Sequence, residues 1–192
     1  MARKLEFDKD IALQKAMRLF WSKGYEATSL DDLVKAMEIN RFSIYNTFGD
    51  KKALLLKALE QYQLLVLNHL IAPLREEVPA AQCLSNYLDN VAAQLLTKAG
   101  LMGCLVQRTG QGNIIQDDEV KRQMLAMLSS LQDALYEIIK RGQDEGGISK
   151  GDASVLTDFV MCHVQGMILL RQTGCKSMSE QVSMLKRMLL NS

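Results

Sequence analysis

Residues 28–51 read TSLDDLVKAMEINRFSIYNTFGDK, and this stretch decides the fold of the first part of the chain. It opens on the hydroxyl pair Thr28-Ser29 with aspartates three positions further on, a pattern typical of a helix start. The apolar residues that then recur at helical spacing are Leu30, Leu33, Val34 and Met37. That spacing predicts a helix that buries one face.

A second short helix is predicted after the turn Glu38-Ile39-Asn40. Asn40 is a favourable N-cap, and the helix is expected to run from Arg41 to Phe48. Ile44 and Phe48 lie four residues apart, so they are expected to share its buried face. Two short helices joined by a tight turn, the second rich in hydrogen-bonding side chains, are typical of a helix-turn-helix.

The segments on either side complete a three-helix head. Residues 8–22 form an amphipathic pattern, and Gly24 can end that helix in a left-handed conformation. Asp50 is the expected cap of a further helix that begins at Lys51. The sequence therefore predicts a helix-turn-helix domain over residues 1–50, followed by a second domain over 51–192.

The outward side chains of this head suit DNA. Arg and Asn can read base edges through paired hydrogen bonds, whereas hydroxyl groups suit phosphates. A lysine in the first turn opposes the helix dipole, so phosphate contact is a reason for Lys51 to stand there. Phe42 has two open interpretations, contact with a thymine methyl group or packing on a sugar. The residues expected to contact double-stranded DNA are Thr28, Ser29, Arg41, Phe42, Ser43, Tyr45, Asn46, Thr47 and Lys51.

The composition of the 192-residue chain predicts an all-α protein. Its 48% hydrophobic and 23% charged residues are ordinary for a globular protein, and it has two prolines. No apolar run approaches the roughly 20 residues that span a bilayer, and the N-terminal segment does not read as a signal peptide. Residues 1–57 hold 11 Lys and Arg against 8 Asp and Glu, a net charge of +3, and the remainder carries −2. A mildly basic head suits contact with phosphates.

Cysteine, histidine and motif content argue against metal sites and catalysis. The four cysteines are widely spaced without a CxxC pair, which predicts reduced thiols and a cytoplasmic protein. The two histidines stand far apart, so no metal site is expected. The chain has no nucleophile motif and no glycine-rich phosphate loop, so we expect neither an enzyme nor a cofactor.

Together, residues 24–25, 28–33 and 39–54 resemble the N-terminal domain of the TetR (tetracycline-repressor) family. The resemblance rests on the aromatic residue after Gly24, the hydroxyl pair at 28–29, the Tyr-x-x-Phe of residues 45–48 and the lysine that follows. The chain departs from the family at Glu38, where Gly is frequent, and at Phe42, where a small residue is frequent. The operator sequence therefore cannot be carried over. The resemblance implies a repressor that a small-molecule effector releases from DNA.

The rest of the chain is expected to be helical, about nine helices in all. Their ranges after the head are 51–72, 81–99, a short helix that starts within 100–105 and ends near 110–112, 117–140, 152–173 and 179–190. Residues 152–173 are apolar around much of the circumference, so that helix needs a second partner. A second subunit fits, because a two-fold homodimer matches a palindromic operator. The residues expected at the dimer interface are Phe159, Val160, Val164, Leu170, Met184 and Met188.

The eleven methionines suit the walls of an apolar effector pocket, although ordinary core packing stays open for each of them. His163 is open in the same way, as an effector ligand or as a core or interface residue. The expected effector-contacting residues are Met102, Cys104, Met127, Leu131, His163 and Met167.

Two alternative functions stay open. Residues 103–105 resemble a Gly-Cys-Leu stretch of some TetR-family members, and a helix start lowers a thiol pKa, so Cys104 is either a redox or electrophile sensor or a small buried group. The chain could also be a helical interaction protein whose head has lost DNA binding.

Overall fold

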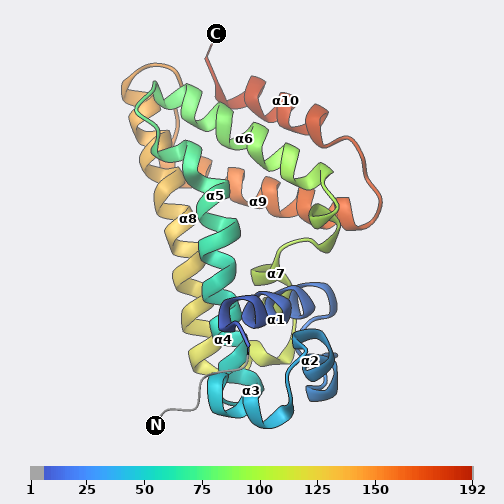
Figure 1. Ribbon diagram of the computed structural model, residues 1–192. Coiled ribbons are helices and arrows are strands. Elements are labelled where there is room, and N and C mark those ends of the chain that lie inside the picture. Colours follow the sequence, from blue (N-terminus) through green and yellow to red (C-terminus); the bar gives the residue numbers. More distant parts are fainter. Residues whose placement is uncertain (1–6, 192) are drawn as a thin grey trace. The chain divides into compact units, whose positions relative to one another are not determined.

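The structure, a computed structural model, describes residues 7–191 (Figure 1). Within this range the elements are α-helices with short 3-10 and π turns, and the one strand-like pairing is an isolated bridge between Ile148 and Leu190. The all-α prediction is confirmed. The chain packs as two compact units, one of residues up to Leu65 with Cys104–Met124, the other of Val66–Gly103 with the residues from Leu125 onward.

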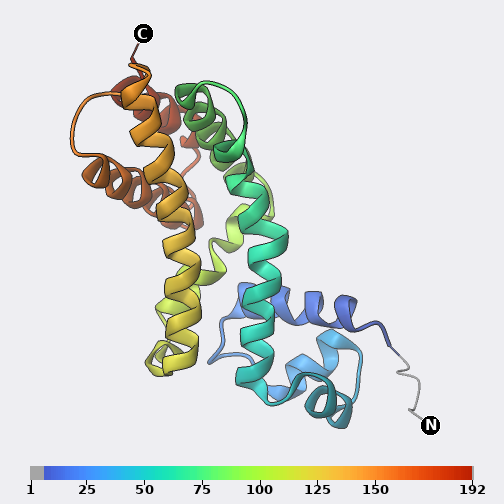
Figure 2. The same ribbon diagram turned by 90° about the vertical axis from the view of Figure 1, so that its left-hand side faces the viewer.

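The first unit contains the predicted three-helix head together with α-helices from later in the chain. Its helices are α1 (Lys9–Lys23), α2 (Leu30–Met37), α3 (Arg41–Phe48), α4 (Lys51–Tyr62) and α7 (Leu105–Gly110), followed by a 3-10 turn at Asn113–Gln116. α1 packs on α2, α4 and α7, and Figure 2 shows α1 crossing α4. The fully buried side chains of this unit include Phe20, Leu33, Ile44, Leu54, Leu55 and Leu59. The domain boundary at residue 50 stays a prediction about function, since α4 and α7 pack with the head.

The second unit is built around α6 (Ala80–Leu96). α10 (Met178–Leu189) and α9 (Ala153–Gln172) both contact α6, as do the short turns Ala72–Arg75 and Ala99–Met102. α5 (Asn68–Ile71) contacts it as well, and α8 (Asp118–Asp144) begins in the first unit and continues in the second. The largest fully buried side chains here are Leu84, Tyr87, Leu88, Leu135 and Ile139.

Two helix boundaries differ from the sequence prediction. The helix expected from Lys51 to just before Pro73 is interrupted by a wide π turn at Gln63–Leu67, which has no fully buried residue and separates α4 from α5. Counting α4 and α5 together gives the expected number of helices, about nine. The helix expected to reach Ala99 ends at Leu96, because Thr97 adopts an extended conformation.

Candidate DNA-binding site

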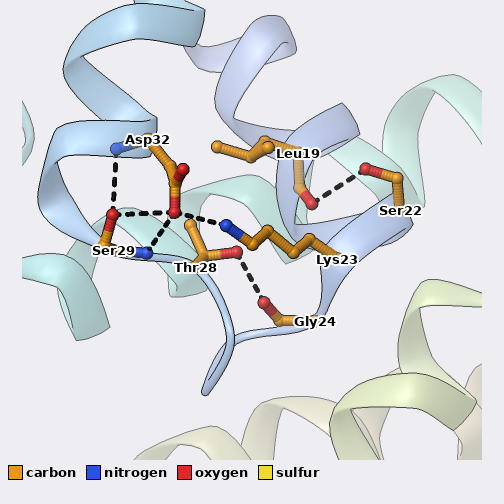
Figure 3. A network of polar contacts seen from close by, with 7 residues as sticks. All are labelled: Leu19, Ser22, Lys23, Gly24, Thr28, Ser29 and Asp32. Atoms are coloured by element: carbon orange, nitrogen blue, oxygen red, sulfur yellow. Dashed lines mark hydrogen bonds and ion pairs between the residues drawn. The ribbon is translucent and has the colours of Figure 1, made fainter.

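The N-terminus of α2 is held by a capping box. The backbone N–H of Asp32 donates to Ser29 Oγ at 3.1 Å, and the Ser29 N–H and hydroxyl both donate to Asp32 Oδ2, at 2.8 and 2.7 Å (Figure 3). Lys23 at the end of α1 pairs with the same oxygen at 2.5 Å. The Lys23 ammonium and, after it, the Ser29 donors hold the pKa of the Asp32 carboxyl well below its usual range. The start of α2 is therefore tied to the end of α1.

This network makes a prediction about pH. Because its folded-state pKa is depressed, Asp32 contributes stability above the ordinary carboxyl pKa of 3.8, and this contribution is lost as the pH falls through the lower folded-state value. Asp32→Asn should therefore lower the melting temperature of the head at pH 7, and its difference from wild type should shrink below about pH 4. Thermal melts from pH 2 to 8 measure this. Glu60→Gln, an exposed residue without an ion pair in the described chain, is the control and should show no such pH-dependent difference.

Thr28 does not lie on the surface. Its side chain is fully buried, and its hydroxyl donates to the Gly24 carbonyl at 2.6 Å, as Figure 3 shows. We therefore leave Thr28 out of the proposed DNA contacts. The two neighbouring hydroxyls therefore have different roles: Thr28 closes the turn after α1, and Ser29 caps α2. Local sequence could not tell which of the two hydroxyls points inward.

The buried hydroxyl of Thr28 leads to a second prediction. Thr28→Val should destabilise the head by about 1–3 kcal/mol, because it keeps the shape but leaves the Gly24 carbonyl without its donor. Thr28→Ser keeps the hydroxyl and should lose less. Trp21 is the single tryptophan and is 7% exposed in the first unit, which contains the head, so its fluorescence during denaturation reports on this unit. Equal stability of the two variants would contradict this role.

The turn between α2 and α3 fits the helix-turn-helix prediction. Glu38 adopts a left-handed conformation with φ of 59°, and its carboxylate pairs with Lys15 of α1 at 2.7 Å. Ile39 is 9% exposed beneath the turn, and Asn40 Oδ1 accepts the N–H of Ser43 at 2.8 Å. Glu38 thus takes a conformation that usually favours glycine, which is the residue that the resemblance led us to expect in this turn.

α3 has one buried face and one open face. Ile44 is fully buried and Phe48 is 5% exposed, which confirms the predicted anchors. On the other side Phe42 is 72% exposed and Tyr45 is 50% exposed. The remaining residues of the predicted contact set on this helix are exposed or half-buried: Arg41, Ser43, Asn46 and Thr47. In α2, Leu33 and Met37 are buried as predicted, whereas Leu30 and Val34 are half-buried.

The first unit also contains contacts of charged side chains that the sequence did not predict. Arg41 Nη2 pairs with Asp31 Oδ1 of α2 at 2.7 Å, with both side chains exposed. Lys51 lies over the ring of Tyr25 at 4.2 Å, and partial burial lowers its pKa. The adjacent Lys52 instead pairs with Asp117 at 3.1 Å.

Lys52 has two carboxylate partners, because Glu119 also lies 3.1 Å from its ammonium group. These partners raise the pKa of Lys52, and Lys52 in turn lowers the pKa of Asp117. Glu26 accepts the Ile114 N–H at 2.9 Å in the same unit. Of the two neighbouring lysines, Lys51 is therefore the one left for an outside anion. The partners of Lys52 lie some 65 residues away in sequence, so no local pattern could reveal them.

The candidate effector residues are divided between the two units. Cys104 lies in the first unit, 8% exposed, and its sulfur contacts the buried phenol of Tyr62, whose pKa is raised by desolvation and by this thiol. This environment favours a small buried group at Cys104. In the second unit Met127 and Met167 are buried, and the half-buried candidates are Met102, Leu131 and His163.

A groove of about 370 Å³ between α9 and α10 brings together residues that the sequence assigned to different sites. His163 and Met167, expected at the effector, line it beside Phe159 and Leu170, expected at the dimer interface. His163 Nε2 is buried without a hydrogen-bond partner. The same groove is therefore lined both by residues predicted to contact the effector and by residues predicted to form the dimer interface.

The predicted dimer residues fall into two groups. Val160 and Val164 are buried within the chain itself, so we leave them out of the proposed interface. The others are 39–55% exposed: Phe159, Leu170, Met184 and Met188.

α9 is long and apolar enough to cross a membrane by length and composition alone. Core helices of soluble proteins pass the same test, so it is weak evidence for a membrane span. Only 28% of the apolar stretch of α9 is buried within the chain. Among residues 7–191, no group of three or more His, Cys, Asp or Glu side chains is arranged to hold a metal ion.

Comparison with known proteins agrees with this geometry. The sequence pattern described as "Bacterial regulatory proteins, tetR family" matches residues 12–58, which cover most of α1 to most of α4. The HTH-type transcriptional repressor ComR of Escherichia coli K12 is 29% identical over 170 residues, covering 88% of this chain and 81% of ComR. The HTH-type transcriptional repressor BdcR of the same organism is 26% identical and covers 90% and 83%.

A solved structure extends the likeness to the whole chain. The TetR family transcriptional regulator CifR, a cysteine mutant bound to a 26-bp double-strand operator DNA, superposes with a TM-score of 0.84 at 26% identity over 97% of each chain. The match covers both the helix-turn-helix and the helices that follow it. Residues 12–58 thus match the tetR family of bacterial regulatory proteins, and the whole chain has the fold of the TetR family regulator CifR.

Proposed function

We propose that this protein is a DNA-binding transcriptional repressor. The observation that carries the proposal is the open face of α3, where exposed Phe42, Tyr45 and Asn46 oppose the buried anchors of the same helix. A helix that locks one face into its domain and presents aromatic and amide groups on the other is suited to the major groove. The operator complex of CifR supports this assignment.

Each contact residue has a proposed role. Arg41 and Asn46 would read base edges, while Ser43, Tyr45 and Thr47 suit the phosphates beside the groove. Ser29 and Arg41 already bond to carboxylates, at 2.7 Å each, so on DNA a phosphate or a base edge must replace or share these partners. Lys51 would add a phosphate contact at the start of α4.

Binding to DNA at several salt concentrations tests this function. The purified protein is titrated against its own upstream region and against unrelated DNA of equal length. We expect sequence-specific binding at least about 10³-fold tighter than non-specific binding, with an affinity that falls steeply with salt. Equal, weak binding to both DNAs would leave a helical interaction protein as the better interpretation.

Lys51 offers a finer prediction in the same assay. Lys51→Ala should weaken binding to all sequences alike and reduce the salt slope by about 1, because one phosphate contact is lost. Lys57→Ala, an exposed lysine further along α4, is the control and should leave the slope unchanged. A change in sequence preference without a change in slope would assign Lys51 to base readout instead.

The protein is proposed to act as a homodimer on a palindromic operator. The exposed apolar side chains of α9 and α10 supply a surface that a second copy can cover by two-fold symmetry. Two heads would then enter successive major grooves about 34–36 Å apart. We place this function in the cytoplasm, with neither an enzymatic role nor a cofactor nor a membrane partner.

A small-molecule effector is proposed to release the repressor. Its contacts are expected among Met102, Cys104, Met127, Leu131, His163 and Met167. Release requires the effector to bind one conformation of the dimer more tightly than the conformation that fits DNA. A liganded crystal structure whose heads kept the DNA-compatible spacing, although the effector abolished binding, would contradict this mechanism.

A further inference from the structure

Phe42 is the most exposed of the large apolar side chains in the described chain, at 72%. It stands in the first turn of α3, directly after Arg41. We propose that Phe42 contacts the C5-methyl group of a thymine in the major groove and so selects an A·T base pair at that position. This inference rests on the proposed DNA-binding function and names one chemical group that the protein reads.

The position of Phe42 on the helix directs it toward the bases. Phe42, Tyr45 and Asn46 are spaced i, i+3 and i+4, so they share one face. That face opposes Ile44 and Phe48, which are buried in the head. Residues near the N-terminus of a recognition helix are those that reach base edges. An Asn on the same face, able to pair with adenine N6 and N7, places this face over base edges rather than over the backbone alone.

Within residues 7–191, no cation lies over the Phe42 ring. The adjacent Arg41 pairs with Asp31 of α2 at 2.7 Å, and on DNA it would turn to a base edge of its own. Among the described residues, no ring contact with another aromatic side chain occupies Phe42. The ring is thus presented on the open face without a partner of its own.

The chemistry of the major groove then decides what the ring can read. A phenyl group neither donates nor accepts a conventional hydrogen bond, so it cannot distinguish bases by the donor and acceptor pattern. The thymine methyl group is the apolar feature of the major groove. A contact between the two removes apolar surface of both from water, which a contact with the polar edges of G·C cannot do.

Deoxyuridine substitution tests this contact, because it removes the methyl group and nothing else. Preferred sites are first selected from random double-stranded DNA with the full-length wild-type protein. Each thymine of the selected site is then replaced by deoxyuridine, one position at a time. At one thymine of each half-site we expect wild-type affinity to fall about fourfold, the factor that burial of one methyl-sized group contributes.

Variants of Phe42 then complete the test. Phe42→Ala should bind thymine and deoxyuridine at that position equally, and Phe42→Leu should keep part of the difference. Ile11→Ala changes an equally apolar, 54% exposed residue of α1 and should retain the full wild-type difference. Circular dichroism melts establish that each variant is folded.

Three results would overturn the inference in distinguishable ways. If no thymine of the selected site is sensitive to deoxyuridine, the ring does not read a methyl group. If Phe42→Ala weakens binding to both DNAs yet keeps the wild-type difference, Phe42 packs on sugar and another residue reads the methyl. If the selection enriches no sequence at all, the proposed DNA-binding function itself fails.

Discussion

Replacing Ile44 with alanine is expected to destabilise the head by about 2–5 kcal/mol and to abolish sequence-specific DNA binding. Ile44 is fully buried and, with Phe48, holds α3 in the head. Truncation removes apolar contacts and leaves a cavity in a closely packed core. Because α3 has only eight residues, it depends on this packing for its helical state.

The fluorescence of Trp21, the single tryptophan of the chain, measures this effect within the first unit. Trp21 is 7% exposed and meets Tyr62 edge to face, with ring centroids 4.9 Å apart. Chemical denaturation followed at this residue should show a lower midpoint for Ile44→Ala. Ile11→Ala removes a 54% exposed side chain of α1 and should stay within about 0.5 kcal/mol of wild type. An unchanged midpoint in Ile44→Ala would show that α3 is not anchored through this residue.

The local signals of the head were sufficient to predict its helices. Asp8, Ser29, Asn40 and Asp50 each accept a backbone N–H at the start of a helix. Such caps act within three residues, so they can be identified from short stretches of sequence. The predicted anchors Ile44 and Phe48 are buried for the same reason, because helical spacing relates residues that are close along the chain.

Faces and distant partners could not be predicted in this way. α9 is apolar around much of its circumference, so spacing alone could not show that Val160 is buried while Phe159 is 39% exposed. Lys51 and Lys52 are adjacent and chemically equal in sequence. Only the fold brings Asp117 to Lys52 and leaves Lys51 over Tyr25. The roles of these residues depend on contacts made after the helices have packed.

Placing glutamates at Met184 and Met188 is expected to weaken dimerisation about 100-fold or more. The two methionines lie four residues apart on α10, 54% and 55% exposed, so the substitutions should not disturb the core. In a two-fold interface each residue occurs twice, and burial of a methionine side chain is worth about 1.5–3 kcal/mol. Introduced carboxylates would, in addition, be buried in the interface and lose their hydration.

Analytical ultracentrifugation at several protein concentrations measures this change, with a thermal melt to establish that the variant is folded. Leu96→Glu, at a 50% exposed position of α6, is the control and should remain dimeric.

The double variant should also lose operator affinity, because two heads joined in a dimer bind with a high effective concentration that separate heads lack. If it stays dimeric at micromolar concentration, the interface lies away from α10. If the dimer dissociates while operator affinity is unchanged, one head is sufficient for recognition, and the palindromic operator is the part of the proposal that fails.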